Sequence, residues 1–373
     1  MKLQCEREKL LHAFQTAASV APARSTKPIL QNVKLEATEA GATVMGTDLE
    51  ISIRIEVPGF EISAPGTIVL PISRFSSILR ESSDAKLSIQ SDGRSITVRG
   101  QQSEFHFPSE NPDEFPTVPV FEAEKYHELP ARFFRELVRR TVFATETESG
   151  RYALGGVLLE LTAKGITGVA TDGRRLARQE GPAKSVGGHE TGDTMTIVPV
   201  RAMQLIERAL ADNEGDIQLT AGPNDVRIKS GRATINSQLV EGRYPKWQDV
   251  FPRREDMIKV ELAVGPFHAA VRQAAIVTSA ERRGVDFTFG EGKVVLAGHG
   301  AEMGESHVEM PIAYDGEPVA ITLDPRYVAD FLRVLDPEQT FTMELRSAES
   351  AGVCTTEDGY GYVIMPLARD QKP

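Results

Sequence analysis

The residue types that most often carry chemistry are thinly spread along this chain of 373 residues. Asp48 and Asp172 recur in matching Thr-Asp contexts, where they could act as a general acid and base or shape a turn. Seven histidines are scattered, and His299 and His307 lie near each other without the helical spacing of a metal site. The sequence has neither a Gly-x-x-x-x-Gly-Lys phosphate loop nor a Gly-x-Gly-x-x-Gly dinucleotide motif. We therefore predict turn-forming aspartates, no metal, no cofactor and no catalytic site.

Composition narrows the class of protein further. Cys5 and Cys354 lie at opposite ends without metal-ligand spacing, so we expect both to be buried rather than joined in a disulfide framework. No apolar run approaches the ~20 residues that span a bilayer, and the first residues are charged too early for a signal peptide. We therefore expect a cytoplasmic protein. Its net charge of -11 argues against a partner held by bulk electrostatic attraction.

The elements that would position any site are repeated. Markers return with a period of about 125 residues, as expected for tandem copies of one module. These markers are a Pro-led helix start (Pro71, Pro199, Pro325), a Thr-Asp pair (Thr47-Asp48, Thr171-Asp172) and an aromatic-Pro pair (Phe115-Pro116, Tyr244-Pro245). The repeat predicts three modules, which we place at residues 1–121, 126–252 and 257–373.

Each module combines helical and strand patterns. Apolar residues at helical spacing predict an opening helix over 6–20, 130–144 and 266–277, and each proline marker predicts a second helix. Most other segments alternate at strand period, for example 86–90 with 96–98 and 216–220 with 226–228. Two helices on a mostly antiparallel sheet make an α+β module. Stretches rich in Pro and acidic residues, 113–125 and 251–257, are predicted linkers.

The predicted helices differ in charge from the whole chain. They carry about thirteen basic against about seven acidic residues, and the excess falls on all three modules. One interpretation is a solvated helix face without a partner, and the other is a positive surface for nucleic acid. The basic residues include Arg74, Arg80, Arg132, Arg135, Arg139, Arg140, Arg201, Arg208, Arg272, Arg326 and Arg333.

A size estimate connects the repeat with DNA. A module of this length is roughly 35 Å across as a compact sphere. Three such spheres in a closed ring leave a hole of about 5 Å, whereas six leave one of about 35 Å. A duplex with grooves about 8 Å deep needs well over ~16 Å. One chain is therefore too small to encircle DNA, but a homodimer is large enough, and two-fold dimers are the commonest oligomers.

Over its whole length the chain resembles the bacterial DNA polymerase III β subunit, the β sliding clamp. Thr-Asp-Gly-Arg-Arg-Leu-Ala at 171–177, Glu-Gly-Arg-Tyr-Pro at 241–245 and the closing Val-Ile-Met-Pro-Leu at 363–367 carry the resemblance. It implies a DNA-clamp fold with three modules per chain and a head-to-tail dimeric ring of six. In such a ring, helices line the hole, double-stranded DNA is enclosed without sequence preference, and no catalytic site is present.

The resemblance also implies partners and sites. An apolar groove between modules 2 and 3 would bind peptides from the replicative polymerase's catalytic subunit, the clamp loader and other proteins with clamp-binding motifs. Its residues would be Leu154, Thr171, Gly173, Arg174, Leu176, Pro245, Val250, Val363, Ile364, Met365, Pro366 and Leu367. The alternative is that 363–365 is simply the last core strand. The tail 368–373 is longer than the family's usual ending, and Trp247, Gln248 and Asp249 are expected to make the rim bulkier and more acidic.

For the dimer joint, Phe105 and Phe107 match the family's apolar pair in module 1, and Ile276 and Val277 match the facing pair in module 3. Alternation puts both Phe on one strand face, which also fits two core residues of module 1. The DNA-facing set combines helix residues with loop residues matched to the family: Arg24, Arg74, Arg80, Arg135, Arg139, Arg140, Arg151, Tyr152 and Arg201. A second hypothesis is a tandem-module adaptor that binds peptides but not DNA, and a monomer in solution would favour it.

Overall fold

The computed structural model describes residues 1–146, 152–211, 213–251, 257–279, 283–300 and 304–367. The chain divides into two compact units. Unit 1 comprises residues 1–135 and 183–239, and unit 2 comprises 136–182 and 240–373. Helix α3 (Ala131–Thr141) runs from the first unit into the second. Predicted modules 1 and 3 therefore fall in different units, and module 2 contributes to both.

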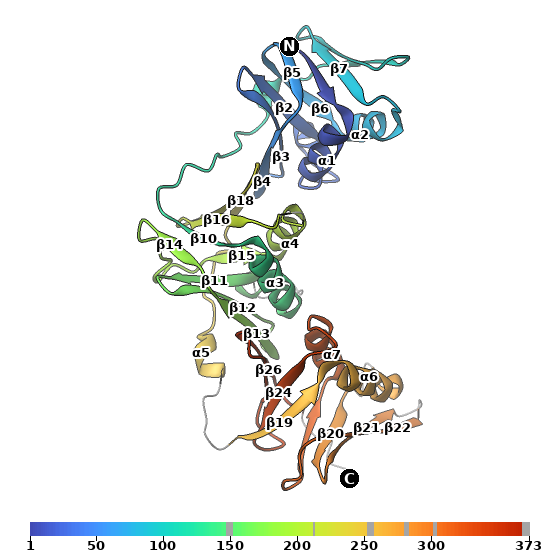
Figure 1. Ribbon diagram of the computed structural model, residues 1–373, viewed down its shortest axis with the longest axis vertical. Helices are drawn as coiled ribbons and strands as arrows, with labels where there is room; N and C mark the ends of the chain where they lie inside the picture. Colours follow the sequence, from blue (N-terminus) through green and yellow to red (C-terminus); the bar gives the residue numbers. More distant parts are fainter. Residues whose placement is uncertain (147–151, 212, 252–256, 280–282, 301–303, 368–373) are drawn as a thin grey trace. The chain divides into compact units, whose positions relative to one another are not determined.

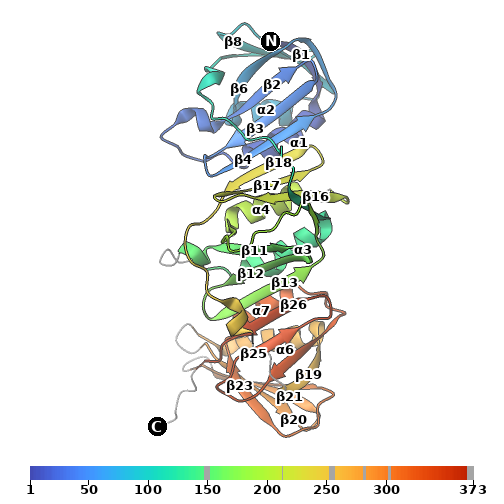
Figure 2. The same cartoon turned by 90° about the vertical axis from the view of Figure 1, so that its left-hand side faces the viewer.

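Unit 1 contains two antiparallel sheets, ordered β5-β1-β7-β8-β9 and β14-β10-β16-β17-β18-β4-β3-β2-β6. The second sheet continues from module 2 into module 1 because β18 pairs with β4, and Figure 2 shows these strands side by side. The elements of unit 1 are β1 (Lys2–Glu6), α1 (Arg7–Ala18), η1 (Pro28–Gln31), β2 (Asn32–Thr38), β3 (Gly41–Thr47), β4 (Ile51–Val57), β5 (Phe60–Ala64), β6 (Gly66–Pro71), α2 (Ile72–Glu81), β7 (Lys86–Ser91), β8 (Ser95–Arg99), β9 (Glu104–Pro108), η2 (Pro112–Glu114), β10 (Tyr126–Pro130), β14 (Lys184–Val186), β15 (Ile197–Pro199), α4 (Val200–Ala209), β16 (Asp216–Ala221), β17 (Asp225–Ser230) and β18 (Ala233–Gln238).

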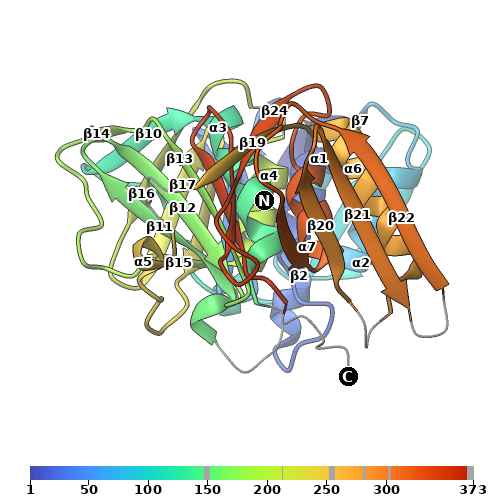
Figure 3. The same ribbon diagram turned by 90° about the horizontal axis from the view of Figure 1, so that it is seen from below.

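Unit 2 repeats this arrangement, with sheet strands in the orders β11-β12-β13-β26-β25-β24-β19 and β22-β21-β20-β23. Here β13 of module 2 pairs with β26 of module 3. Figure 3 shows β20, β21 and β22 in succession, with β22 at the edge. The elements are η3 (Val142–Ala144), η4 (Tyr152–Leu154), β11 (Gly156–Thr162), β12 (Gly165–Thr171), β13 (Arg175–Gly181), α5 (Trp247–Val250), β19 (Ile258–Ala263), α6 (Val264–Ala274), η5 (Ala275–Val277), β20 (Val285–Gly290), β21 (Lys293–Gly300), β22 (Gly304–Pro311), β23 (Val319–Leu323), α7 (Pro325–Arg333), β24 (Thr340–Leu345), β25 (Gly352–Thr355) and β26 (Tyr360–Ile364).

Buried aromatic rings hold the helix pairs against the sheets. In unit 1, Phe14 of α1 and Phe75 of α2 are fully buried with ring centroids 4.9 Å apart. In unit 2, Phe331 of α7 stacks on Tyr362 of β26 at 5.1 Å and meets Phe341 of β24 at 5.2 Å. Figure 1 shows α1 beside α2 and α6 beside α7. Each helix pair therefore shares one core with the strands beneath it and leaves its polar face outward.

The predicted helices and hairpins are confirmed, with differences at their ends. Pro71 and Pro199 occupy the N-cap of α2 and α4, whereas Pro325 lies within the first turn of α7. The Asp324 side chain caps α7 by accepting a hydrogen bond from the Arg326 backbone N–H at 3.0 Å. The prediction missed the short helix α5, because its four residues give no periodic signal.

The predicted first linker is partly wrong. Phe115 and Val118 are buried, and they pack with Met45 and Val69 of module 1. The apolar side chains of this Pro-rich stretch therefore pack its first part against module 1 instead of leaving it a free linker. Both cysteines are buried as expected, and burial raises the pKa of the Cys5 thiol to about 12. No helix in the described part of the chain combines the length and apolar character needed to cross a bilayer.

Candidate functional site

The two recurring aspartates shape the same turn in two modules. Asp172 Oδ1 accepts hydrogen bonds from the backbone N–H groups of Arg174 and Arg175 at 2.9 and 3.0 Å. Asp48 Oδ1 does the same for Glu50 and Ile51 at 3.0 and 2.7 Å. Both carboxylates are therefore occupied by backbone donors, which confirms the turn interpretation over a paired acid and base.

Within unit 2, this turn brings the candidate groove residues together. Arg174 C=O accepts the Met365 N–H at 2.9 Å, and Leu176 of β13 lies opposite Val363 of β26. The stretch before α5 joins them because Tyr244 donates its hydroxyl to Val169 C=O at 3.1 Å. We call the twelve predicted groove residues the candidate peptide surface. It is contributed by the β12–β13 turn, the end of β26, η4 and the 240–250 stretch.

The candidate peptide surface has a buried layer and an exposed layer. Leu154, Thr171, Leu176, Val363 and Ile364 are buried, and Pro366 and Leu367 are half-buried. Gly173, Arg174, Pro245, Val250 and Met365 are exposed. Met365 is 45% exposed, although it directly follows a fully buried strand. An exposed apolar side chain on a buried apolar support is chemistry that suits a partner's apolar side chain.

The joint between modules 1 and 2, within unit 1, repeats this backbone frame with different side chains, among them Leu49, which is 44% exposed. Leu49 has φ of 83° where Gly173 has 86°, and Gln238 N–H donates to Glu50 C=O as Met365 does to Arg174. The place of Met365 is therefore taken by Gln238, whose side-chain amide donates to Leu49 C=O at 3.1 Å. Arg201 pairs with Asp48 and donates to Val20 C=O at 2.8 Å. The two joints therefore differ at the Met365 position, where unit 1 has a polar side chain that is already hydrogen-bonded to its own turn.

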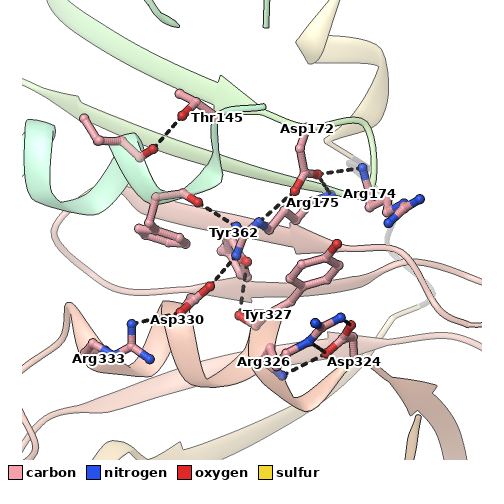
Figure 4. A network of polar contacts seen from close by, with 12 residues as sticks. Thr145, Asp172, Arg174, Arg175, Asp324, Arg326, Tyr327, Asp330, Arg333 and Tyr362 are labelled. Carbon is pink, nitrogen blue, oxygen red and sulfur yellow. Dashed lines mark hydrogen bonds and ion pairs between the residues drawn. The ribbon is translucent and has the colours of Figure 1, made fainter. Parts of the chain in front are cut away.

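Arg175 is a residue of this region that the sequence reasoning missed. It lies under the turn, and its guanidinium contacts Asp172 at 3.0 Å, Asp330 at 2.7 Å and Phe143 C=O at 2.6 Å (Figure 4). The same group lies over the Tyr327 ring, 4.5 Å from its centroid. Asp330 and Tyr327 belong to α7, so one side chain ties module 2 to module 3. The sequence offered one signal for it. Arg174 and Arg175 are consecutive, and because neighbouring strand residues point to opposite faces, one of the two side chains had to point inward.

Replacing Arg175 by alanine is expected to lower the free energy of unfolding by about 3 kcal/mol. The reason is that the Asp172 and Asp330 carboxylates would lose their cationic partner at a largely buried joint. The urea midpoint of the full chain measures this. Lys293→Ala is the matched control, since Lys293 and Glu309 form an exposed pair at 2.9 Å whose loss costs under ~1 kcal/mol. Equal midpoints for the two variants would contradict the role of Arg175.

The rim differs from expectation. Trp247 is buried rather than exposed, and its indole N–H donates to Glu160 at 3.0 Å. Arg178 lies over the rings of Trp247 and Phe251, so this aromatic segment packs onto module 2. Gln248 and Asp249 remain exposed. The bulk predicted for the rim was therefore wrong for Trp247, whose large apolar ring favours burial. The tail 368–373 lies outside the described residues.

Apart from Arg140, the predicted DNA-facing residues fall into three groups. Arg24, Arg74, Arg80 and Arg139 are exposed, and none forms an ion pair with a described residue. Arg135 contacts Glu214 at 3.7 Å, and Arg201 is bound to Asp48 as above. Arg151 and the Tyr152 side chain lie outside the described residues.

Arg140 corrects the prediction. It is 2% exposed and pairs with Glu136 at 2.6 Å and Asp358 at 2.8 Å. Its guanidinium also lies over the Tyr360 ring at 5.0 Å. The charge of Arg140 is therefore used inside the protein and is not available to DNA. Helix position alone misled the prediction, because it does not distinguish an inward-facing arginine from an outward-facing one.

The predicted dimer residues differ in how exposed they are. Phe105 of β9 is 38% exposed, whereas Phe107 is buried opposite Ile96 of β8 and belongs to the core of module 1. Ile276 of η5 is 72% exposed, and Val277 is half-buried. Phe105 lines a depression of about 520 Å³ with Ile78 at the end of α2. The core alternative therefore holds for Phe107, whose side chain is covered by its own module, but not for Phe105 on the same strand face.

Metal-ligating side chains do not gather in the described residues. His127 and His189 meet with their Nδ1 atoms 2.8 Å apart, but His189 Nε2 accepts the Ala221 N–H at 3.1 Å. Both ring nitrogens of His189 thus have hydrogen-bond partners within the protein, Nδ1 with His127 and Nε2 with Ala221. Burial, and to a lesser extent His127, lower the pKa of His189 despite the Ala221 hydrogen bond, and both partners of His189 lie within the protein.

Comparison with known proteins identifies the family. The chain matches the N-terminal, central and C-terminal domains of the DNA polymerase III beta subunit over residues 1–119, 128–246 and 248–368. It is 30% identical to the beta sliding clamp of Pseudomonas putida and 28% identical to that of Escherichia coli K12, covering 98% of this chain and all of each relative.

Solved structures agree. A sliding clamp from Pseudomonas aeruginosa, bound to griselimycin, superimposes with a TM-score of 0.91 at 27% identity over 99% of both chains. The Caulobacter crescentus beta sliding clamp gives a TM-score of 0.89 at 28% identity, also over 99% of both chains. The chain therefore belongs to the DNA polymerase III beta subunit family, the beta sliding clamps, and is a non-catalytic processivity factor with the three-domain clamp fold.

Proposed function

We propose that two copies of this chain close head to tail into a ring of six modules around double-stranded DNA. The observation that carries this proposal is a pair of exposed sheet edges. Strand β9 ends one sheet in module 1 and β22 ends another in module 3. Unpaired edge strands present free backbone donors and acceptors that favour pairing with another chain. Phe105 next to one edge and Ile276 near the other supply exposed apolar side chains for the same joint.

The proposed module boundaries remain 1–121, 126–252 and 257–373. DNA would be held mainly by enclosure, with Arg24, Arg74, Arg80 and Arg139 as exposed cations for its phosphates. Few cations and a net charge of -11 suit a ring that slides, since strong phosphate pairing would hold it in place. A cytoplasmic location follows from a role in replicating bacterial DNA.

The candidate peptide surface would bind the replicative polymerase's catalytic subunit, the clamp loader and other proteins with short clamp-binding motifs. Its support is the exposed Met365 on a buried apolar layer, at a position where the joint between modules 1 and 2 has the polar Gln238. Because each ring would carry two such surfaces, two partners could be held on one ring.

A topological assay tests the ring. Purified clamp is loaded onto nicked circular DNA with its clamp loader and ATP, and the circle is then linearised on half of the sample. We expect the clamp to stay on the circle and leave the linear form from its ends, because enclosure alone resists loss. Gel filtration of labelled clamp with DNA measures retention. Equal loss from both forms would show ordinary surface binding and overturn the ring.

A further inference from the structure

The helix pair of module 3 carries a cluster of cationic side chains that the DNA-facing set above leaves out. His268 and Arg272 lie one turn apart on α6, and Arg333 is the last residue of α7. Arg272 and Arg333 are exposed and His268 is half-buried, and helices α6 and α7 lie beside each other in Figure 1. Burial lowers the pKa of His268, and the charges of Arg272 and Arg333 lower it further.

The acidic groups nearby do not balance this cluster. Asp330 contacts Arg333 at 3.0 Å, but it also contacts Arg175 at 2.7 Å, so one carboxylate serves two guanidinium groups (Figure 4). Arg272 forms no ion pair with any described carboxylate. The cluster therefore holds uncompensated positive charge at a half-exposed position, which attracts an anion.

The other elements packed on α6 direct their charges elsewhere. On β22, Ser306 faces α6 by donating to Ala274 C=O at 2.8 Å, so the alternate residues Glu305, His307 and Glu309 lie on the opposite face. On β21, Gly298 faces α6, which places Lys293 and His299 on that opposite face. On β19, the buried residues face the helix, and Lys259 and Glu261 are exposed.

The remaining neighbours supply no compensating acid. Segment η5 has no charged residue. The loop that follows α7 meets the start of α6, where the Gly265 N–H donates to Pro337 C=O at 3.0 Å. In that loop, Asp336 is engaged by the Glu338 N–H, and neither Asp336 nor Glu338 is among the charges that shift His268. His268 and Arg272 lie one turn apart on α6, and Arg333 lies four residues before Pro337, which contacts the start of α6 at Gly265.

We propose that His268, Arg272 and Arg333 form a proton-linked phosphate site through which module 3 contacts the backbone of enclosed duplex DNA. The proposal rests on the proposed ring. A phosphodiester anion between the three side chains offsets their mutual repulsion, and an imidazolium adds a donor to the two guanidinium groups. His268 therefore takes up a proton when the phosphate binds, and contact with DNA at this site strengthens as pH falls.

The position of His268 on its helix holds no histidine in the other two modules. Leu10 of α1, Phe134 of α3 and Phe267 of α6 occupy matching buried positions in the three opening helices. The next residue is Leu11 in module 1, Arg135 in module 2 and His268 in module 3. An uncharged residue, an arginine and a histidine thus occupy this helix position in modules 1, 2 and 3.

Binding of a fluorescent short duplex to the purified protein at low salt tests the proposal. Below the pKa of free His268 the site is already protonated, and above the pKa of the bound form it is neutral. Affinity should therefore be higher at about pH 6 than at about pH 8, by about threefold to tenfold for a pKa rise of about one unit or less on binding. His268→Gln should lose this His268-dependent ratio, and His268→Lys should bind tightly at both pH values. The same pH ratio in wild type and His268→Gln would overturn the proposal.

Two further arms separate the sources of phosphate and the underlying ring. Histidine NMR, with the His268 signal assigned from the Gln variant, should show a rise in its pKa with the duplex and a smaller rise with inorganic phosphate at equal ionic strength. An equal rise with inorganic phosphate would make this a free-phosphate site and overturn the DNA assignment. Retention on nicked circles should be the same for all three proteins, since it depends on topology. If no protein is retained on circles, the ring proposal fails instead.

Discussion

Replacing Ile276 by aspartate is expected to convert the dimer into monomers. Ile276 is 72% exposed in this chain, so the change leaves the fold of module 3 intact. In the proposed ring it places a carboxylate in each of two apolar joints. At about 3 kcal/mol per joint, the dissociation constant rises by about four orders of magnitude. Sedimentation equilibrium should then report a mass near 40.8 kDa rather than twice that value.

The control is Val120→Asp, which puts the same charge on a residue that is 39% exposed outside the proposed joint. It should remain dimeric. Phe107→Asp is a poor test because Phe107 is buried within module 1, and the variant would lose the module's own packing. An Ile276→Asp protein that keeps the dimer mass would exclude this joint. A monomeric wild type would revive the tandem-module adaptor.

Replacing Met365 by alanine should weaken the binding of a synthetic peptide from the polymerase tail by about tenfold to a hundredfold. The reason is the loss of apolar contact at the exposed centre of the candidate peptide surface, worth about 1–3 kcal/mol. Isothermal titration calorimetry measures the affinity. Thermal stability and dimer mass should not change, because the Met365 side chain is half in solvent before any peptide binds.

Met195→Ala provides a matched control, since Met195 is 46% exposed against 45% for Met365 and lies outside the candidate peptide surface. It should bind the peptide as tightly as the wild type. Equal weakening by both substitutions would point to a general loss of apolar surface rather than a site. No weakening by Met365→Ala would show that partners bind elsewhere on the chain.

Local features could be predicted because they depend on neighbours in sequence. The Pro-led helices, the hairpins and the Thr-Asp turns are set by backbone restrictions and by periods of apolar residues within a few positions. Repetition of these signals predicted three α+β modules, and the family motifs then singled out the ends of β13 and β26. Strand pairing of Leu176 with Val363 agrees with their assignment to one surface.

The sequence by itself determined the repeat, the fold class and the family, and its motifs supplied the twelve residues proposed for the candidate peptide surface. Tertiary structure alone decided which charged and aromatic side chains face inward: Arg140 and Trp247 are buried, Phe107 belongs to a core, and Arg175 ties α7 to the turn. It also packed α7, which ends at Arg333, beside the helix that carries His268 and Arg272. These outcomes depend on partners 35 to 220 residues apart, as in Tyr362 with Tyr327 and Tyr360 with Arg140, and no local period encodes contacts of that range.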